Sequence, residues 1–291
     1  MEYRFKPGEY ERFGRTIVVN DFSMRSDPVT PAKTGPDEIR VLCLGDSVLN
    51  GGSQTDHTEL ATTIWQEKLT AEFGRPVWVG NASAGSWGPG NLLAYTQKFG
   101  WFDADVVVIL LSSHDAGDVM RFIPVAGSAN FPNRKPWLAL QEGITRYLPR
   151  YLPRASSPAS PTPAEPVQPE GADYERDSPN VSLALGKLDE LVQSARAGGT
   201  RPVLLIQHPE RLIELDGPWL PGHAWMADIA KQSGADTLEL REALRSDIAQ
   251  GRTPYQDNIH LNPRGQQVLV DAVWPWLNRA VAHATQVEKQ D

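Results

Sequence analysis

The stretch Ile39-Arg40-Val41-Leu42-Cys43-Leu44-Gly45-Asp46-Ser47 decides the fold of this chain. Its apolar run, ended by a glycine, is typical of a strand that is buried on both faces. Runs of similar character are found at residues 76–79, 105–111, 202–206 and, more weakly, 237–240. The sequence therefore predicts about five strands, each short and mostly buried.

Segments with helical spacing lie between these strands. A helix is expected to start near Asp56, whose side chain can cap it with Glu59 three residues on. Another helix is expected to end at Gly198-Gly199, and the last helix to begin at Asn262-Pro263 and to bend at Pro275. Strands alternating with helices predict an α/β fold with a parallel sheet covered on both faces. Ligands of such sheets bind beyond the carboxyl ends of the strands.

The chain is expected to form one large α/β domain at residues 39–285. Residues 1–38 are polar and rich in turn formers, so we expect an N-terminal arm laid over the domain, and residues 286–291 form a tail. A proline-rich insertion at 124–180 interrupts the alternation. Its first half is expected to form a short amphipathic helix, acting either as a lid or as an insertion without a catalytic role. The low-complexity stretch at 156–171 is expected to be a disordered loop.

Composition excludes several classes of function. The formal net charge is −8 and no Lys/Arg cluster offers a face for phosphates, so no nucleic-acid partner is expected. The single cysteine, Cys43, cannot form an intrachain disulfide and is expected to be a buried core thiol. The sequence lacks an apolar run of about 18 residues, so no transmembrane segment is expected. The start at Met1 has no signal-peptide character, which indicates the cytoplasm by default, or the periplasm if a leader was removed.

Two short motifs carry the chemistry. Gly45-Asp46-Ser47 follows the first strand, so the Ser47 hydroxyl is expected to face the ligand crevice, although the triplet alone would also suit a serine that caps a turn. Asp257-Asn258-Ile259-His260 lies in a polar loop just before the last helix. A serine hydroxyl needs a base to remove its proton, and a histidine oriented by a carboxylate is that base near neutral pH. The sequence therefore predicts Ser47, His260 and Asp257 as a catalytic triad.

Taken together, the motifs resemble the SGNH (GDSL-like) hydrolase superfamily. The resemblance rests on an early GDS block, a glycine block after the second strand, an ND-like block after the third and a late DxxH block, and it covers roughly residues 39–282. The second glycine of the G-x-S-x-G elbow is missing, which argues against the α/β-hydrolase family. The resemblance implies a flavodoxin-like three-layer α/β/α sandwich that hydrolyses esters of lipids, carbohydrates or small acyl donors without a metal or another cofactor.

Two blocks depart from the family pattern. In Asn81-Ala82-Ser83-Ala84-Gly85-Ser86, the oxyanion amide belongs to Gly85 or its role has passed to Ser86. In Leu111-Ser112-Ser113-His114-Asp115, His114 stands where the family has an oxyanion asparagine. The expected oxyanion donors are therefore the amides of Ser47 and Gly85 and the imidazole of His114. The expected substrate-binding residues are Trp87, Ser86 and Asp46, whereas core positions are favoured for Trp219 and Trp225 and a surface position for His208.

The resulting prediction is a serine esterase that cleaves O-acyl esters, O-acetyl foremost, through an acyl-enzyme. Its expected partner is a small acyl ester or an acylated carbohydrate. Two alternatives stay open at this point. One is an O-acetyltransferase of bacterial exopolysaccharide modification, which passes the acyl group to a sugar hydroxyl. The other is a non-catalytic carbohydrate-binding protein on the same fold.

Overall fold

A computed structural model describes residues 1–122, 140, 175–197 and 201–287 of the chain. By internal contacts the chain divides into two units, one made of Met1, Tyr3–Met120 and Asp173–Asp291, the other of Glu2 and Arg121–Ala172. The first unit contains the sheet, the helices and the candidate site. Nearly all of the 124–180 insertion, including its predicted lid and loop, lies outside the described residues.

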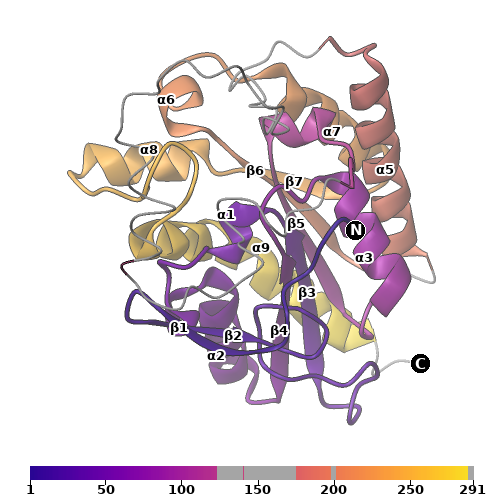
Figure 1. The fold of residues 1–291 in the computed structure, drawn as a ribbon. Helices are drawn as coiled ribbons and strands as arrows, with labels where there is room; N and C mark the ends of the chain where they lie inside the picture. Colours follow the sequence, from indigo (N-terminus) through magenta and orange to yellow (C-terminus); the bar gives the residue numbers. More distant parts are fainter. Residues whose placement is uncertain (123–139, 141–174, 198–200, 288–291) are drawn as a thin grey trace. The chain divides into compact units, whose positions relative to one another are not determined.

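The first unit is built on a parallel sheet of five strands (Figure 1). The strands are β3 (Ile39–Gly45), β4 (Val77–Ser83), β5 (Val106–Ser112), β6 (Val203–His208) and β7 (Asp236–Glu239). Their order across the sheet is β4-β3-β5-β6-β7, and every neighbouring pair is parallel. This is the flavodoxin-like order: β4 is added on one side of β3, and β5, β6 and β7 are then added in turn on its other side. The predicted strands and fold class are confirmed.

Helices cover both faces of the sheet (Figure 1). Each face of the sheet has its own hydrophobic core. Alternate residues of one strand pack into different cores, because successive side chains of a strand point to opposite faces. Leu42 and Leu44 pack on the side of α3 (Pro89–Phe99), α5 (Pro179–Arg196) and α7 (Pro221–Gln232). Val41 and Cys43 pack on the side of α2 (Ala61–Phe73), α8 (Arg241–Ala249) and α9 (Pro263–Val287). Cys43 is fully buried, as predicted, and burial raises the pKa of its thiol.

One helix start differs from its prediction. Asp56 and Glu59 do form a capping box, but it caps the 3-10 turn η1 (His57–Glu59), and α2 begins only at Ala61. The reason is local: Leu60 is extended and interrupts the helical hydrogen bonding. The Ala61 amide instead donates to Oε1 of Gln266, a residue of α9, at 3.0 Å.

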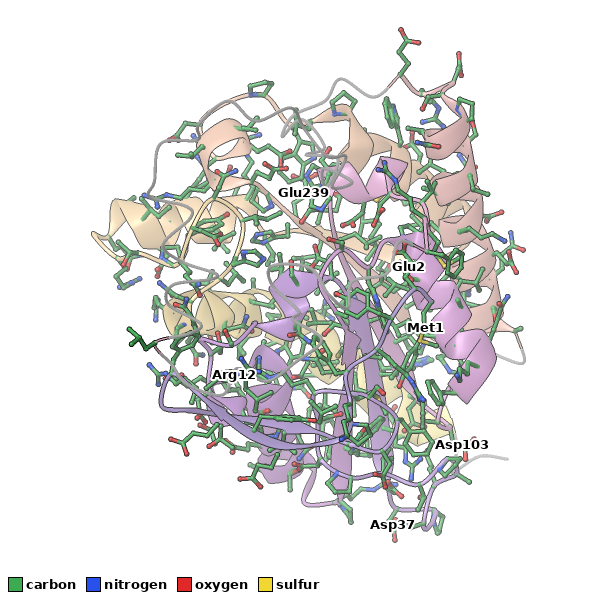
Figure 2. All side chains as sticks on the ribbon, viewed as in Figure 1. Met1, Glu2, Arg12, Asp37, Asp103 and Glu239 are labelled. Atoms are coloured by element: carbon green, nitrogen blue, oxygen red, sulfur yellow. The ribbon has the colours of Figure 1, made fainter. Side chains whose placement is uncertain are left out.

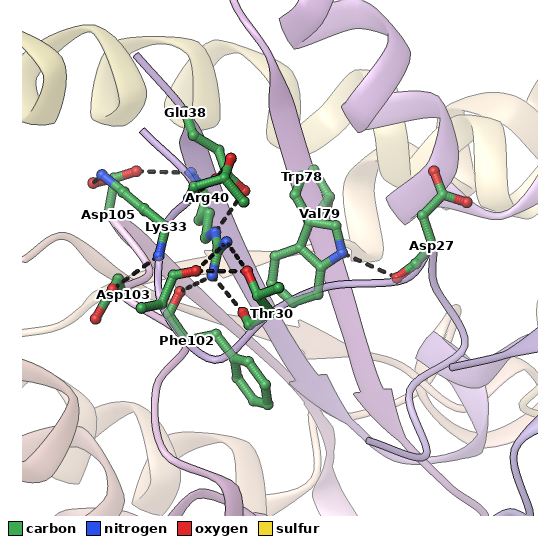
Figure 3. A network of polar contacts seen from close by, with 12 residues as sticks. Asp27, Thr30, Lys33, Glu38, Arg40, Trp78, Val79, Phe102, Asp103 and Asp105 are labelled. Carbon is green, nitrogen blue, oxygen red and sulfur yellow. Dashed lines mark hydrogen bonds and ion pairs between the residues drawn. The ribbon is translucent and has the colours of Figure 1, made fainter. Parts of the chain in front are cut away.

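The N-terminal segment is more structured than its composition indicates. It contains a hairpin of β1 (Gly8–Arg12) and β2 (Arg15–Val19). It also covers the buried guanidinium of Arg40 at the start of β3, which donates to the carbonyls of Thr30 and Ala32, both at 2.8 Å (Figure 3). These bonds fasten the segment to the amino end of the sheet. The carboxyl end, where Glu239 closes β7, lies opposite Asp37 and Asp103, which precede β3 and β5 (Figure 2).

Within the described ranges, no helix combines the length and the apolar character that crossing a bilayer requires.

Candidate active site

Ser47 stands at the carboxyl end of β3, as the first residue of the short helix α1 (Ser47–Asn50). Asp46 caps this helix, accepting a hydrogen bond from the Val48 amide at 2.8 Å. Gly45 is required by close approach, because a Cβ there would lie 2.9 Å from Leu49 Cβ and 3.0 Å from the Leu110 carbonyl. The sharp strand-to-helix turn thus brings Ser47 to the edge of the sheet where ligands of α/β folds bind.

The structure brings Ser47, His260 and Asp257 together across more than two hundred residues of sequence. His260 Nε2 lies 2.8 Å from Ser47 Oγ, and His260 Nδ1 lies 2.7 Å from Asp257 Oδ2. Since the carboxylate accepts from Nδ1–H, Nε2 is free to accept the serine proton. This arrangement can generate a serine nucleophile and return the proton to a leaving group.

Asp257 is held as a carboxylate. Its Oδ1 accepts from the amides of Ile259 at 2.9 Å and His260 at 2.7 Å. Partial burial acts to raise the pKa of Asp257, but these hydrogen bonds and the one from the His260 ring lower it below its usual value. The carboxylate therefore stays ionised near neutral pH and can stabilise an imidazolium at His260.

The loop after β4 supplies Gly85 and Ser86. The Gly85 carbonyl accepts from the Tyr3 hydroxyl at 2.5 Å, so the N-terminal segment also fastens this loop. Ser86 is exposed and has a left-handed backbone, with φ of 54°. Both residues follow the carboxyl end of a strand adjacent to β3, which places their amides at the same edge as Ser47.

His114 lies in the 3-10 helix η2 (Ser113–Gly117), directly after β5, among carboxylates. Its Nε2 is 3.7 Å from Asp115 Oδ1 and its Nδ1 is 3.7 Å from Glu210 Oε1. Burial acts to lower the pKa of His114, but the charges of Asp115, Glu210 and Asp46 outweigh it and raise that pKa to about 10. The imidazole is thus an imidazolium at neutral pH.

The Asp46 side chain also belongs to this cluster. It is 1% exposed, and both burial and the neighbouring charge of Asp115 raise its pKa to about 7. One atom from each of Asp46, His114 and Asp115 that could bind a metal, a carboxylate oxygen or a ring nitrogen, lies within 4.8 Å of the other two. Two carboxylates and an imidazole could hold a divalent cation, which would compete with the proton for the His114 imidazole. Because Asp46 is buried, its prediction as a substrate-binding residue needs correction: it caps α1 and faces His114.

The aromatic prediction also needs correction. Trp87 is 1% exposed and packs between Tyr3 and Tyr95, with ring centroids 6.3 and 5.8 Å away. Its ring faces are therefore not offered to a sugar. Trp219 stacks on His223 at 3.9 Å, and Trp225 packs against the apolar core.

Some residues near the site were not found from the sequence. His208, at the end of β6, is fully buried rather than at the surface. Arg25 is 1% exposed and donates to the carbonyl of Asn50, the last residue of α1, and to those of Gly52 and Thr55 in the loop that follows. The position of His208 at the carboxyl end of a strand indicates that it lies near the pocket, but its hydrogen bond to the Ile259 carbonyl has no signature in the sequence. Arg25, in a polar segment without periodicity, offers no such signal.

Comparison with known proteins places the chain in a family. The model of the GDSL-like Lipase/Acylhydrolase family matches residues 43–268, more than half of the chain. No curated protein matches the chain by sequence.

Several solved structures are similar to this chain at low sequence identity. A two-domain esterase active on acetylated mannans has a TM-score of 0.52 at 12% identity, covering 84% of this chain and 49% of that one, so this chain spans about half of it. A lipolytic G-D-S-L protein from Veillonella parvula DSM 2008 has a TM-score of 0.49 at 12% identity, with coverages of 83% and 99%. A variant acetyl xylan esterase from Geobacillus stearothermophilus has a TM-score of 0.47 at 14% identity, with coverages of 87% and 97%.

The family match begins inside β3, just before Ser47, and runs past the DxxH loop into α9. The chain therefore belongs to the GDSL-like lipase/acylhydrolase family and is a serine hydrolase of the carboxylic ester type.

Proposed function

We propose that the chain is an esterase that removes short acyl groups, O-acetyl foremost, from a carbohydrate, with Ser47 as nucleophile. The observation that carries the proposal is the continuous chain of short contacts from Ser47 Oγ through His260 to Asp257, at 2.8 and 2.7 Å. A reacting group bound beyond the carboxyl end of β3 would meet the hydroxyl directly.

In the acylation step, Ser47 Oγ attacks the ester carbonyl while His260 Nε2 takes its proton. A bond forms between Oγ and the carbonyl carbon, and the carbonyl electron pair moves onto oxygen. As the tetrahedral intermediate collapses, His260 gives the proton to the leaving alcohol and Ser47 is left acylated. Asp257 stabilises the imidazolium throughout and keeps the ring in one tautomer.

Water repeats these steps in the deacylation half. His260 takes a proton from water, the hydroxide adds to the acyl carbon, and the proton returns to Ser47 Oγ as the free acid leaves. An acceptor sugar in place of water would make the same site an acyltransferase.

The oxyanion is assigned to the amides of Ser47 and Gly85 together with His114. Preorganised donors aimed at the developing charge are commonly the largest contribution to catalysis of acyl transfer. An imidazolium at His114 would add a positive charge to the two amides. The carboxylates of Asp115 and Glu210 hold it in this charged form.

The proposed substrate class rests on the family resemblance and on neighbours of the same fold, one of them an esterase active on acetylated mannans. Trp87 no longer supports it, because its ring is buried. The substrate is therefore tested directly: acetate release from acetylated mannan and xylan oligosaccharides should exceed release of longer acids from matched esters. A preference for long acyl chains would contradict the proposal, and transfer of acetate to an added sugar, rather than its release, would favour the acyltransferase.

The first prediction concerns the nucleophile. Ser47→Ala should lower kcat on p-nitrophenyl acetate by about 10⁴-fold or more, because triad members act as a unit, and it should retain the folded circular dichroism spectrum. Ser53→Ala, the same change six positions on in the neighbouring loop, is the matched control and should keep wild-type kcat. Ser47→Ala protein with wild-type activity would refute the proposed mechanism.

A further inference from the structure

His208, the buried histidine at the end of β6, contacts the loop before α9 that carries His260. His208 is fully buried, and its Nε2 lies 2.7 Å from the carbonyl oxygen of Ile259, the residue before His260. Its ring also packs at 47° against Tyr255, with centroids 5.7 Å apart. The mechanism above assigns His208 no task.

The protonation state of His208 follows from this environment. Burial lowers its pKa to about 4, with the nearby His223 and His260 acting in the same direction, while the Ile259 carbonyl and Glu214 act to raise it. The imidazole is therefore neutral near pH 7. A carbonyl can only accept, so the single N–H is on Nε2 and points at Ile259. Within the described ranges, Nδ1 has no hydrogen-bond partner, which leaves the Ile259 contact as the polar function of this ring.

The accepting carbonyl belongs to the peptide group that carries His260. The N–H of the same peptide, that of His260, donates to Asp257 Oδ1 at 2.7 Å. A peptide group is planar, so fixing its oxygen and its nitrogen fixes the orientation of the whole plane. The Cα of His260 is attached to that plane, and the ring reaches Ser47 from there.

Other hydrogen bonds attach the loop before α9 to the segment after β6, at Tyr255 and Asn258. Asn258 accepts from Arg211 N at its carbonyl, at 2.7 Å, and from Leu212 N at its side chain, at 2.8 Å. The Tyr255 hydroxyl donates to the Pro209 carbonyl at 2.9 Å. These bonds hold the loop in place without touching the Ile259–His260 peptide.

We propose that His208 is a positioning residue: its Nε2–H clamps the Ile259–His260 peptide and thereby keeps the His260 imidazole in line with Ser47. The proposal rests on the triad of the proposed function. Loss of the donor should impair the chemical step more than substrate binding, because a displacement of about 1 Å in a catalytic group can cost on the order of 10²-fold in rate.

The test compares side chains that differ only in the donor. Methionine and glutamine have similar length and shape, but only glutamine offers an N–H near the position of Nε2. His208→Met should lower kcat by about 10–100-fold with KM within about twofold, and its rate of fluorophosphonate labelling should fall equally. His208→Gln should recover most of both. If His208→Met does not fold, His208→Asn, whose shorter amide cannot reach Ile259, should show the same loss.

Tyr255→Phe is the matched control, since it removes a hydrogen bond from the same network but leaves the Ile259 carbonyl paired. It should lower Tm while keeping kcat within about twofold, as expected for one neutral hydrogen bond distant from the chemistry. Unimpaired His208→Met, no recovery in His208→Gln, or an equal loss of kcat in Tyr255→Phe would each overturn the proposal. Ser47→Ala in the same series separates the two claims: if it is inactive, these outcomes count against His208 alone, whereas an active Ser47→Ala overturns the triad and this proposal with it.

Discussion

At the scale of single residues, the notable feature is the His114 imidazole, which lies among carboxylates that include Asp46, the residue before Ser47. His114 has Asp115 and Glu210 at 3.7 Å from its two ring nitrogens, and neither contact is short enough for a strong hydrogen bond. The side chain is 36% exposed, so the ring is held electrostatically while part of it faces solvent. This combination suits a charged donor for an oxyanion.

If His114 acts in this way, His114→Ala should lower kcat by about 10²–10³-fold with little change in KM, because one oxyanion donor is lost. His114→Asn should recover much of this loss, since its amide N–H can serve as the donor. Steady-state kinetics on a short acyl ester checks both variants. An unimpaired His114→Ala would exclude the role.

The same assignment predicts a pH dependence. The pKa of His114 is raised to about 10, so the imidazolium persists through neutral pH and loses its proton as the pH rises past that value. The wild-type kcat should therefore decline above about pH 10, and His114→Asn should lack that decline. The profile is best measured on an alkyl ester, which resists alkaline hydrolysis better than a nitrophenyl ester. Identical profiles would contradict the assignment.

Asp46 gives a prediction about stability. Its pKa is raised from 3.8 to about 7, chiefly by burial and then by the charge of Asp115. The native state thus keeps a proton that the unfolded chain releases above about pH 4, so its contribution to stability is lost as the pH rises through about 7. Asp46→Asn stays uncharged and can still cap α1. Urea unfolding at pH 4.5 and pH 8 should therefore show a smaller loss of stability with rising pH in this variant.

Asp216→Asn, which removes an exposed carboxylate, is the control for this experiment and should behave as wild type. Equal pH dependence in Asp46→Asn and wild type would mean that Asp46 is ionised in the folded protein at all these pH values.

At the scale of elements, the strands were predictable and several helices were not. The strands β3, β5 and β6 are fully buried and mostly apolar, and a short apolar run of this kind is recognisable from the sequence alone. Helices α3, α7 and α8 and the hairpin β1–β2 were missed. Pro89 and Pro221 stand in the first turn of α3 and α7, which is a helix-start signal, but the glycine after each proline makes the pair resemble a turn.

The loop after α1 illustrates what an isolated element cannot show. Gly51 ends α1 with a left-handed backbone, at φ of 72°, and the carbonyls of Asn50 at the helix end and of Gly52 and Thr55 in the loop accept from the buried Arg25. Arg25→Met would leave the buried carbonyls of Asn50 and Thr55 without their donor, at about 1–3 kcal/mol for each buried group, whereas the exposed Gly52 carbonyl can bind water. We expect a loss of unfolding free energy of at least about 2 kcal/mol in chemical denaturation.

Arg15→Met is the control for this variant. Its guanidinium meets Glu59 at 3.3 Å with both side chains partly exposed, and such pairs contribute about 0–1 kcal/mol. A change below about 1 kcal/mol in Arg25→Met as well would show that the loop holds its conformation without the arginine.

At the scale of the whole molecule, the contact of His260 with Ser47 and Asp257 could be predicted, because the fold brings their two loops together. Parallel strands place Ser47 and the loop before α9 at one edge of the sheet, so two short motifs suffice to infer their meeting. The residues that support them could not be predicted in this way. Arg25 and His208 act through backbone carbonyls, which carry no sequence signature, and the burial of Trp87 depends on Tyr3 and Tyr95 from other segments.

Removal of residues 156–171 tests the domain organisation that the composition predicts. This proline-rich stretch lies outside the described residues, and its sequence has too little apolar character to support a packed core. Its deletion should leave Tm and esterase rate nearly unchanged, because loop closure depends weakly on loop length. A marked fall in either quantity would show that the stretch packs against the domain.

The central claim is that Ser47 is an activated nucleophile, and covalent labelling tests it most directly. A fluorophosphonate reacts with a serine whose proton is removed by a neighbouring base, so the native protein should gain the mass of one phosphonyl group on the peptide that contains Ser47. Labelling should be absent from Ser47→Ala and strongly slowed in His260→Ala. A native protein that takes up no label, or takes it up equally in Ser47→Ala, would contradict the account.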